Sequence, residues 1–180
     1  HLTFSISEFT SVQSDGGSIV NDGFSHLRYN YQASSLMVIE AFLQGQYDRS
    51  QDLQQRYLAG GGLRLIAIET DRYGVAVGVS SMYEWEELTS GATTSLARSS
   101  NYLSLSAEKK KAWSLSTTTY VQPAWEDFGD TRVLIESDLS VDLATFLAVT
   151  ADVTYRHDSE PPSGTKHYDL TLKNGLKVMF

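Results

Sequence analysis

The last thirteen residues of the chain, 168–180, alternate apolar and polar side chains up to a terminal phenylalanine. Because successive side chains of a strand point to opposite faces, this alternation predicts a strand with one apolar face and one polar face. The apolar face carries Tyr168, Leu170, Leu172, Leu176, Val178 and Phe180. The polar face carries Asp169, Thr171, Lys173, Gly175 and Lys177. Such a strand separates an apolar environment from a charged one.

The same two-residue alternation recurs along the whole chain, and no stretch keeps the 3.6-residue apolar period of a helix. We therefore predict an all-β chain that forms one domain over residues 1–180, with about ten strands and a range of eight to twelve. The predicted strands are residues 1–13, 24–34, 36–50, 54–69, 72–87, 96–109, 111–126, 131–143, 145–158 and 167–180.

The connections between these strands are expected to alternate in length. Tight turns are predicted at 34–35, 70–71, 110–111 and 144–145, and longer loops at 14–23, 49–53, 88–95, 127–130 and 159–166. This alternation is typical of a single antiparallel up-and-down transmembrane β-barrel with short periplasmic turns and longer extracellular loops. An even number of strands then places both termini in the periplasm of a bacterium.

Aromatic residues recur twelve positions apart on the same face of three predicted strands. The pairs are Tyr73 with Trp85, Trp113 with Trp125, and Tyr168 with Phe180. At about 3.3 Å per residue and a tilt of about 45°, twelve residues rise about 28 Å, close to the apolar band of such barrels. Each pair would place one ring at each membrane interface, where aromatic residues are enriched. A soluble sandwich or lipocalin-like barrel also has alternating strands, but the repeated spacing favours a barrel in the outer membrane.

Composition excludes several other classes of protein. The chain has no cysteine, so neither a disulfide nor a thiolate metal site is expected. Its formal charge of -8 argues against nucleic acid as a partner. No apolar run approaches the ~18 residues of a membrane helix. The chain starts at His1 without a leader, and we expect a processed product that lacks its signal peptide or an N-terminal piece.

In a membrane barrel the polar strand faces line the lumen, and both signs of charge occur on them here. The expected lumen charges are Arg28, Glu40, Arg56, Arg64, Glu136, Asp138, Asp152, Arg156, Asp169, Lys173 and Lys177, with Glu84 and Glu86 near the top of the fifth strand. A ten-stranded barrel is only slightly wider than the eight-stranded kind that side chains fill. Opposite charges should therefore pair, because an unpaired buried charge is costly. They form either a structural ionic plug or the lining of a constricted pore.

Gly60-Gly61-Gly62 invites comparison with a phosphate-binding loop. Neither a helix start nor a Lys-Ser/Thr pair follows it, so we reject that interpretation. Glycines in a barrel strand more often mark a bend, a bulge, or a place where a bulky lumen side chain lies against the wall. We expect a large neighbour such as Phe42, Arg56 or Arg64 to fill this space.

Titratable residues near the predicted loops raise the question of catalysis. His157, Asp158, Glu160 and His167 surround the 159–166 loop, where ten-stranded outer-membrane proteases carry catalytic acid and histidine groups. No nucleophile motif or metalloprotease spacing accompanies them, so we expect no enzyme, no catalytic residue, no cofactor and no metal site. The rim acids are interpreted as solvated loop charge or weak bridges to lipopolysaccharide phosphates. They are Asp15, Asp22, Asp48, Asp52, Glu86, Glu87, Glu126, Asp127, Asp130 and Asp158.

Two stretches of the sequence are similar to a known family. The first is Tyr47-Asp48-Arg49 with Gln55-Arg56-Tyr57-Leu58-Ala59-Gly60-Gly61-Gly62-Leu63-Arg64. The second is Tyr155-Arg156-His157-Asp158-Ser159-Glu160-Pro161-Pro162-Ser163-Gly164, followed by residues 169–172 and 176–180. Over residues 40–180 the chain resembles the YdiY-like salt-induced outer-membrane proteins, a domain family of unknown function. His157 stands where the family often has tyrosine.

The resemblance implies a barrel inserted by the barrel-assembly machinery, which reads the carboxyl-terminal strand. Residues Tyr168, Leu176, Val178 and Phe180 would form that assembly signal. Outer-membrane lipids and lipopolysaccharide are the implied surroundings. The family supplies no activity, and its name suggests a response to salt or osmotic stress.

Three functions follow as hypotheses. The chain is a structural or interaction barrel that supports the envelope or a protein partner in a larger envelope complex, a narrow passive channel for small solutes or ions, or an outer-membrane hydrolase. The sequence does not decide between the first two, and the family resemblance favours the general class of an outer-membrane barrel of unknown activity. The charges on the polar strand faces favour a charge-plugged, narrow lumen, with the channel as the alternative.

Overall fold

The computed structural model describes residues 2–14, 17–49, 52–162 and 164–178, with side-chain detail from residue 22 onward. Its strands are β1 (Leu2–Ser14), β2 (Gly17–Gln32), β3 (Met37–Asp48), β4 (Leu53–Glu69), β5 (Tyr73–Leu88), β6 (Thr93–Lys109), β7 (Trp113–Pro123), β8 (Thr131–Ala144), β9 (Leu147–Asp158) and β10 (Tyr168–Val178). They form one ten-stranded sheet in sequence order, and each neighbouring pair is antiparallel. The all-β, up-and-down prediction is confirmed.

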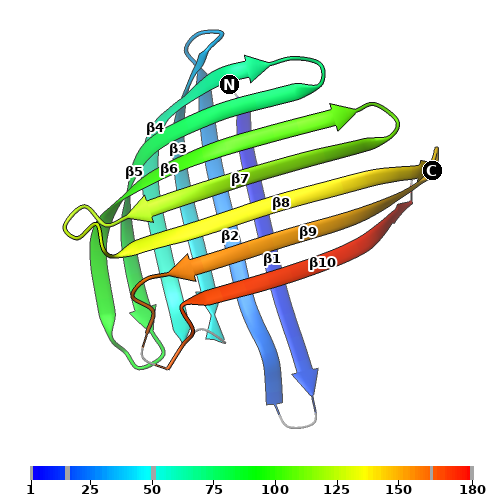
Figure 1. Ribbon diagram of the computed structural model, residues 1–180. Coiled ribbons are helices and arrows are strands. Elements are labelled where there is room, and N and C mark those ends of the chain that lie inside the picture. The colour runs from blue at the N-terminus through cyan, green and yellow to red at the C-terminus, as the bar shows by residue number, and fades with distance from the viewer. Residues whose placement is uncertain (1, 15–16, 50–51, 163, 179–180) are drawn as a thin grey trace.

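The connections fall into two sets at opposite ends of the sheet (Figure 1). One end, here called the short-turn end, has the connections 33–36, 70–72, 110–112 and 145–146. The other, the long-loop end, has the connections 49–52, 89–92, 124–130 and 159–167. Only the last two are clearly longer than the short turns, so the asymmetry between the two ends is smaller than expected.

The prediction of a long loop at 14–23 is wrong. Strand β2 begins at Gly17, and its first residues pair with β1, as in the partners Val12 with Val20 and Phe9 with Gly23. Glycine, serine and aspartate suggested a loop, but backbone groups that find partners on a neighbouring strand continue the ladder whatever the side chains are. The hairpin of β1 and β2 therefore extends beyond the neighbouring strands (Figure 1).

Both described chain ends lie at the short-turn end. Leu2 pairs with Asn30, close to the 33–36 turn, and Val178 pairs with Leu147, beside the 145–146 turn. This arrangement follows from the even number of strands in a meander. Residues 179–180, and with them the expected interface ring of Phe180, lie outside the described residues.

The sheet is strongly curved (Figure 1). The hydroxyl of Tyr102 on β6 donates a hydrogen bond of 2.6 Å to Glu40 on β3, and Arg132 on β8 lies 2.5 Å from Glu84 on β5. Each of these strand pairs is three strands apart, which corresponds to about 14 Å in a flat sheet. We call the concave face that carries these side chains the inner face, and the opposite one the outer face. Among the described residues no pairing joins β1 to β10, so closure into a barrel stays a prediction.

Polarity across the curved sheet is the reverse of that in a water-soluble protein. The outer face carries large exposed apolar side chains, including Leu43, Leu63, Val79, Leu103, Leu139 and Leu172. The inner face buries the charged side chains of Glu40, Glu84, Glu86 and Arg98. A few apolar side chains, such as Leu58 and Met82, are buried among them. The described part of the chain contains no helix that is long and apolar enough to span a membrane.

Candidate functional site

The long-loop half of the inner face holds a cluster of three arginines and four carboxylates, which we call the arginine network. Its members are Arg56, Glu84, Glu86, Arg98, Asp130, Arg132 and Asp158. They come from strands β4, β5, β6, β8 and β9 and from the 124–130 connection. With three positive and four negative groups, its formal charge is -1.

Arg98 is the most buried member of the arginine network, with 1% of its surface exposed. Its Nη2 donates to both carboxylate oxygens of Asp130, at 2.9 and 2.8 Å. Its Nη1 donates to the backbone carbonyls of Gln122 at 3.3 Å and Asp130 at 3.1 Å. Hydrogen bonds between a guanidinium and a carboxylate are roughly twice as strong as those between neutral groups. Arg98 therefore holds the 124–130 connection against β6.

Glu84 joins the three arginines of the network. Arg132 Nη1 lies 2.5 Å from its carboxylate, Arg98 Nε 3.6 Å and Arg56 Nε 4.0 Å. Glu86 is shared between Arg56, which contacts it closely, and Arg132 at 3.3 Å. Because a buried carboxylate without partners is costly, these contacts compensate for the loss of water around Glu84.

Arg132 also extends the arginine network to the last long connection. Its Nε donates to Asp158 at the end of β9, at 2.8 Å. The other carboxylate oxygen of Asp158 accepts a hydrogen bond of 3.0 Å from the backbone N–H of Glu160. The network thus fixes the bases of both long connections, 124–130 and 159–167.

A second set of polar contacts, which we call the tyrosine layer, lies between the arginine network and the short-turn end. Tyr102 donates to Glu40 at 2.6 Å and accepts a hydrogen bond of 2.9 Å from Arg64 Nε. Arg64 Nη2 also pairs with the other oxygen of Glu40. The ring of Tyr120 packs against that of Tyr102 with 5.3 Å between centroids. This layer links β3, β4, β6 and β7 across the inner face.

Glycines make room for the bulky side chains of the inner face. A Cβ atom at Gly78 would overlap the ring of Tyr102, and one at Gly60 would overlap the ring of Phe42. The expectation that a glycine beside Phe42 lets a large side chain lie against the wall is confirmed. Gly78 serves the tyrosine layer in the same way, because only a residue without Cβ leaves space for the ring.

The inner face of β8, β9 and β10 is charged but open to solvent. Arg156 and Asp169 are opposite each other in register, about half exposed, with 3.7 Å between Nη1 and Oδ2. Asp138 is opposite Asp152, which in turn is opposite Lys173. The remaining predicted lumen charges on these strands, Glu136 and Lys177, are also exposed. This side of the interior is therefore less tightly filled than the side formed by β3 to β6.

Arg28 lies on β2, near the opposite edge of the sheet from β8 to β10. Its register partner Phe42 belongs to the inner face, and the Nε of Arg28 is buried without a hydrogen-bond partner among the described residues. The carboxylate of Glu136 on β8 interacts electrostatically with Arg156 and with Arg28. Strands β2 and β8 are thus brought within electrostatic reach of each other.

Small side chains leave a cavity of about 600 Å³ in the short-turn half of the structure. Residues without bulk from β5, β6 and β7 contribute to its lining, namely Gly74, Ala76, Ser104, Ser106, Ser114 and Ser116. Asp138, Ser140, Thr150 and Asp152 contribute from β8 and β9. Arg64 of the tyrosine layer is also part of the lining.

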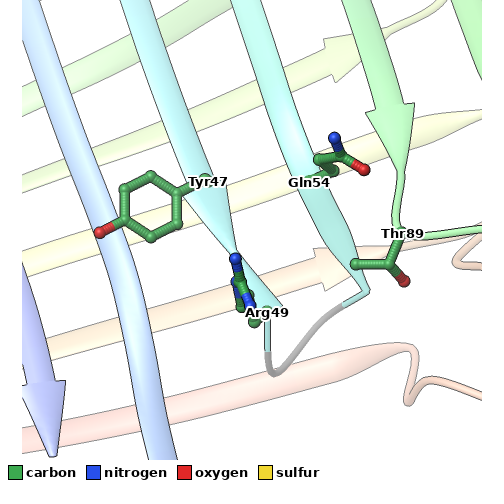
Figure 2. Close-up of a pocket in the computed structure, with 4 residues that line it drawn as sticks. All are labelled: Tyr47, Arg49, Gln54 and Thr89. Carbon is green, nitrogen blue, oxygen red and sulfur yellow. The ribbon is translucent and has the colours of Figure 1, made fainter. Parts of the chain in front are cut away.

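Another cavity, of about 560 Å³, lies at the long-loop end between β3, β4 and the 89–92 connection. Figure 2 shows its lining residues Tyr47, Arg49, Gln54 and Thr89. The Tyr47 ring points away from the other three side chains, so the polar groups do not converge on one point. We assign no site to this cavity.

The interface aromatics expected from the sequence lie on the outer face where they are described. Tyr73, Trp113, Trp125 and Tyr168 are exposed, and Trp85 stacks on Tyr57 at 5.8 Å. Trp125 does not belong to a strand, because β7 already ends at Pro123. Its indole N–H donates to the Ser81 hydroxyl on β5 at 3.2 Å, which keeps the ring on the outer face.

The residues considered for a hydrolytic site do not converge. His157 is opposite Val133 and Tyr168 on the outer face, whereas Asp158 faces inward to Arg132. His167 Nδ1 lies 3.1 Å from the backbone carbonyl oxygen of Asp158 and not from its carboxylate. Within the described residues no group of three or more histidine or acidic side chains could hold a metal ion.

Sequence reasoning missed three central residues of the interior: Arg98, Arg132 and Tyr102. Alternation along the strands places them on the inner face. Arg132 lies four residues before Glu136 on the same face of β8, and Tyr102 is opposite Gly78. The same two-residue alternation, applied to every charged and aromatic residue, would have placed them on the inner face. Asp130 and Asp158 were also misread as solvated rim acids, and Glu86 was counted both among them and among the inward charges. Arg56 and Arg132 are the register partners of Glu86 and Asp158, whereas Asp130 meets Arg98 only through the fold of the 124–130 connection.

The fold and the site together define a class of protein: a curved, up-and-down antiparallel sheet with a charged, partly filled concave face and an apolar convex face. The chain belongs to the family described as "Protein of unknown function, DUF481", whose pattern matches residues 8–180. This match is consistent with the resemblance to YdiY-like outer-membrane proteins. A comparison with curated proteins found no match.

Proposed function

We propose that this chain is an integral protein of the bacterial outer membrane, closed into a barrel by its first and last strands, with a structural or interaction role. The short-turn end and both termini would lie in the periplasm. The lumen is obstructed on its extracellular side by the arginine network. Partners are the lipids and lipopolysaccharide of the membrane, the barrel-assembly machinery during insertion, and a protein of a larger envelope complex.

The inverted polarity of the sheet carries this proposal. Apolar outer side chains such as Leu172 and Val79 are exposed, while Arg98 and Glu84 are buried. The accessible surface of the chain is 11640 Å², against about 8,700 Å² expected for a water-soluble monomer of 20.0 kDa. Lipid would cover the exposed apolar side chains of the outer face, and a barrel satisfies every backbone group internally.

Closure is supported by an electrostatic interaction between two strands that are far apart in the sheet order. Arg28 on β2 and Glu136 on β8 interact although six strand positions separate them in the sheet order. Closure would also remove the two unpaired strand edges, which no spanning protein leaves in contact with lipid.

The arginine network supports a role other than free passage of solutes. Seven charged side chains from five strands and one connection are paired with each other at the long-loop end. Such pairs hold strands in register across the interior and obstruct the path through it. A response to salt or osmotic stress would then reflect envelope support and not transport.

Folding into a membrane tests the first part of the proposal. The purified protein is expected to need detergent or lipid, and to migrate faster on gels before boiling than after, as a closed barrel does. A protein that stays monomeric and folded in buffer alone contradicts the membrane assignment. In planar bilayers the folded protein should give no steady conductance.

A narrow passive channel is the second candidate, favoured by the exposed inner charges of β8 to β10. Conductance steps that change when Glu136, Asp138 or Arg156 is neutralised would establish it. The hydrolase is not proposed, because His157 and Asp158 lie on opposite faces of the sheet.

A further inference from the structure

We infer that the interior is a one-ended cup: it admits small neutral or positively charged polar solutes from the short-turn side and is closed toward the long loops. This inference rests on the proposed function, which supplies the barrel wall. It assigns a ligand compartment to the 600 Å³ cavity, whose residues the arginine network does not use.

The cup exists because three adjacent strands present small residues on the inner face at the same level. Ala76 is opposite Ser104, Gly74 is opposite Ser106, and Ser106 is opposite Ser116. No side chain in these rows can reach across the interior. The volume of the cavity falls within the range of 300–1,000 Å³ that is common for small-molecule sites.

Arg64 forms the closed end of the cup. It lines the cavity, and its guanidinium is held by Tyr102 at 2.9 Å and by Glu40. Beyond this layer Ser100 is only 4% exposed and accepts a hydrogen bond of 3.0 Å from Gln122. The arginine network follows. Two successive polar layers therefore lie between the cup and the long-loop end along β3, β4, β6 and β7.

The lining includes apolar residues such as Ile66 and Leu115, and its polar groups determine which solutes the cup admits. Its hydroxyl groups, including Ser104, Ser106, Ser114, Ser116, Ser140 and Thr150, both donate and accept hydrogen bonds. Four carboxylates, those of Glu69, Glu108, Asp138 and Asp152, face two arginines, Arg64 and Arg72. The net charge of the lining is thus -2, and Arg64 is already paired with Glu40. Anions are disfavoured, whereas neutral hydroxylated solutes and small cations are accommodated.

Single-cysteine variants test the cup directly, because the natural chain contains no cysteine. Ser116→Cys places a thiol in the cavity, Ser100→Cys places one beyond the tyrosine layer, and Thr145→Cys places one on an exposed short turn. The folded protein in detergent is treated with a cationic trimethylammonium methanethiosulfonate or an anionic sulfonate methanethiosulfonate. Rates are divided by those of Thr145→Cys, which removes the intrinsic difference between the reagents.

The expected result has two parts. The thiol of Ser116→Cys reacts readily. That of Ser100→Cys reacts about a hundredfold more slowly, because the reagent reaches it only when the surrounding structure opens locally. After normalisation the cationic reagent is favoured about fivefold at Ser116→Cys, and the substitutions Asp138→Asn and Asp152→Asn together remove this preference.

Four results would overturn the inference. Equal rates at Ser100→Cys and Ser116→Cys would show a continuous path, and an unreactive Ser116→Cys would show a filled cavity. A preference for the anionic reagent would contradict the charge argument. So would a cationic preference that survives the two asparagine substitutions. Failure of the membrane assignment is recognised separately, because it appears as folding without detergent and does not depend on these rates.

Discussion

Arg98 and Glu84, on neighbouring strands, are the two most completely buried large side chains of the described protein, 1% and 2% exposed, with Nε and Oε1 3.6 Å apart. That distance is beyond a hydrogen bond, and both atoms are otherwise without hydrogen-bond partners among the described residues. The pair therefore depends on the rest of the arginine network. Asp130 satisfies Arg98, and Arg132 satisfies Glu84.

Arg98→Met tests how much the arginine network stabilises the fold. We expect a loss of about 3–5 kcal/mol in the free energy of unfolding, because Glu84 and Asp130 lose a buried partner. Urea unfolding in lipid vesicles, followed by tryptophan fluorescence, measures it. The matched control is Arg156→Met, whose side chain is 53% exposed in its pair with Asp169 and should cost about 0–1 kcal/mol. Equal costs would contradict a structural role for the network.

Leu103→Arg tests whether the outer face meets lipid. Leu103 lies near the middle of β6 and is 42% exposed, so in water an arginine there would cost little. In a bilayer we expect a cost of about 2–4 kcal/mol at mid-depth and about 0–1 kcal/mol near the interface. Leu36→Arg, on a short turn and 62% exposed, is the matched control near the interface. If folding into vesicles is unaffected by both changes, the outer face does not contact hydrocarbon.

Gly78→Ala should disrupt the tyrosine layer. The added Cβ would overlap the Tyr102 ring, and an overpacked interior costs about 1–3 kcal/mol. Gly45→Ala is the control, because its Cβ would lie at an ordinary 3.4 Å from Tyr57 and should change stability by no more than about 0.5 kcal/mol. Thermal unfolding of both variants compares them. A Gly78→Ala protein as stable as the Gly45→Ala protein would show that the ring can move away.

Tyr102→Phe removes the hydroxyl that joins Glu40 to Arg64. Hydrogen bonds to charged groups contribute about 1.5–3 kcal/mol, and we expect a destabilisation of that size in urea unfolding. Tyr120→Phe serves as its control, since the Tyr120 hydroxyl has no hydrogen-bond partner among the described residues and the change should cost no more than about 0.5 kcal/mol. The hypothesis fails if both variants unfold at the same urea concentration.

Local alternation predicted strands well and connections less well. Nine of the ten expected strands begin within three residues of the observed ones, because period-two polarity is a property of the strand itself. The exception is β2, where residues 17–23 are paired although their composition suggests a loop. β7 also ends three residues early, at Pro123, and beyond it Ala124 forms only an isolated bridge with Arg98. Strand ends depend on backbone partners, which lie on other parts of the chain.

The sequence by itself determined the all-β meander and the inward face of strand charges such as Glu40, Arg56 and Arg64, because the alternation of side chains is local. Only the tertiary structure decided which charges meet. Arg132 reaches Glu84 from three strands away, and Tyr102 reaches Glu40 across the same distance, both through the curvature of the sheet. Curvature also decided where the interior stays empty, since the small residues of β5, β6 and β7 leave a cavity only where no distant side chain crosses it.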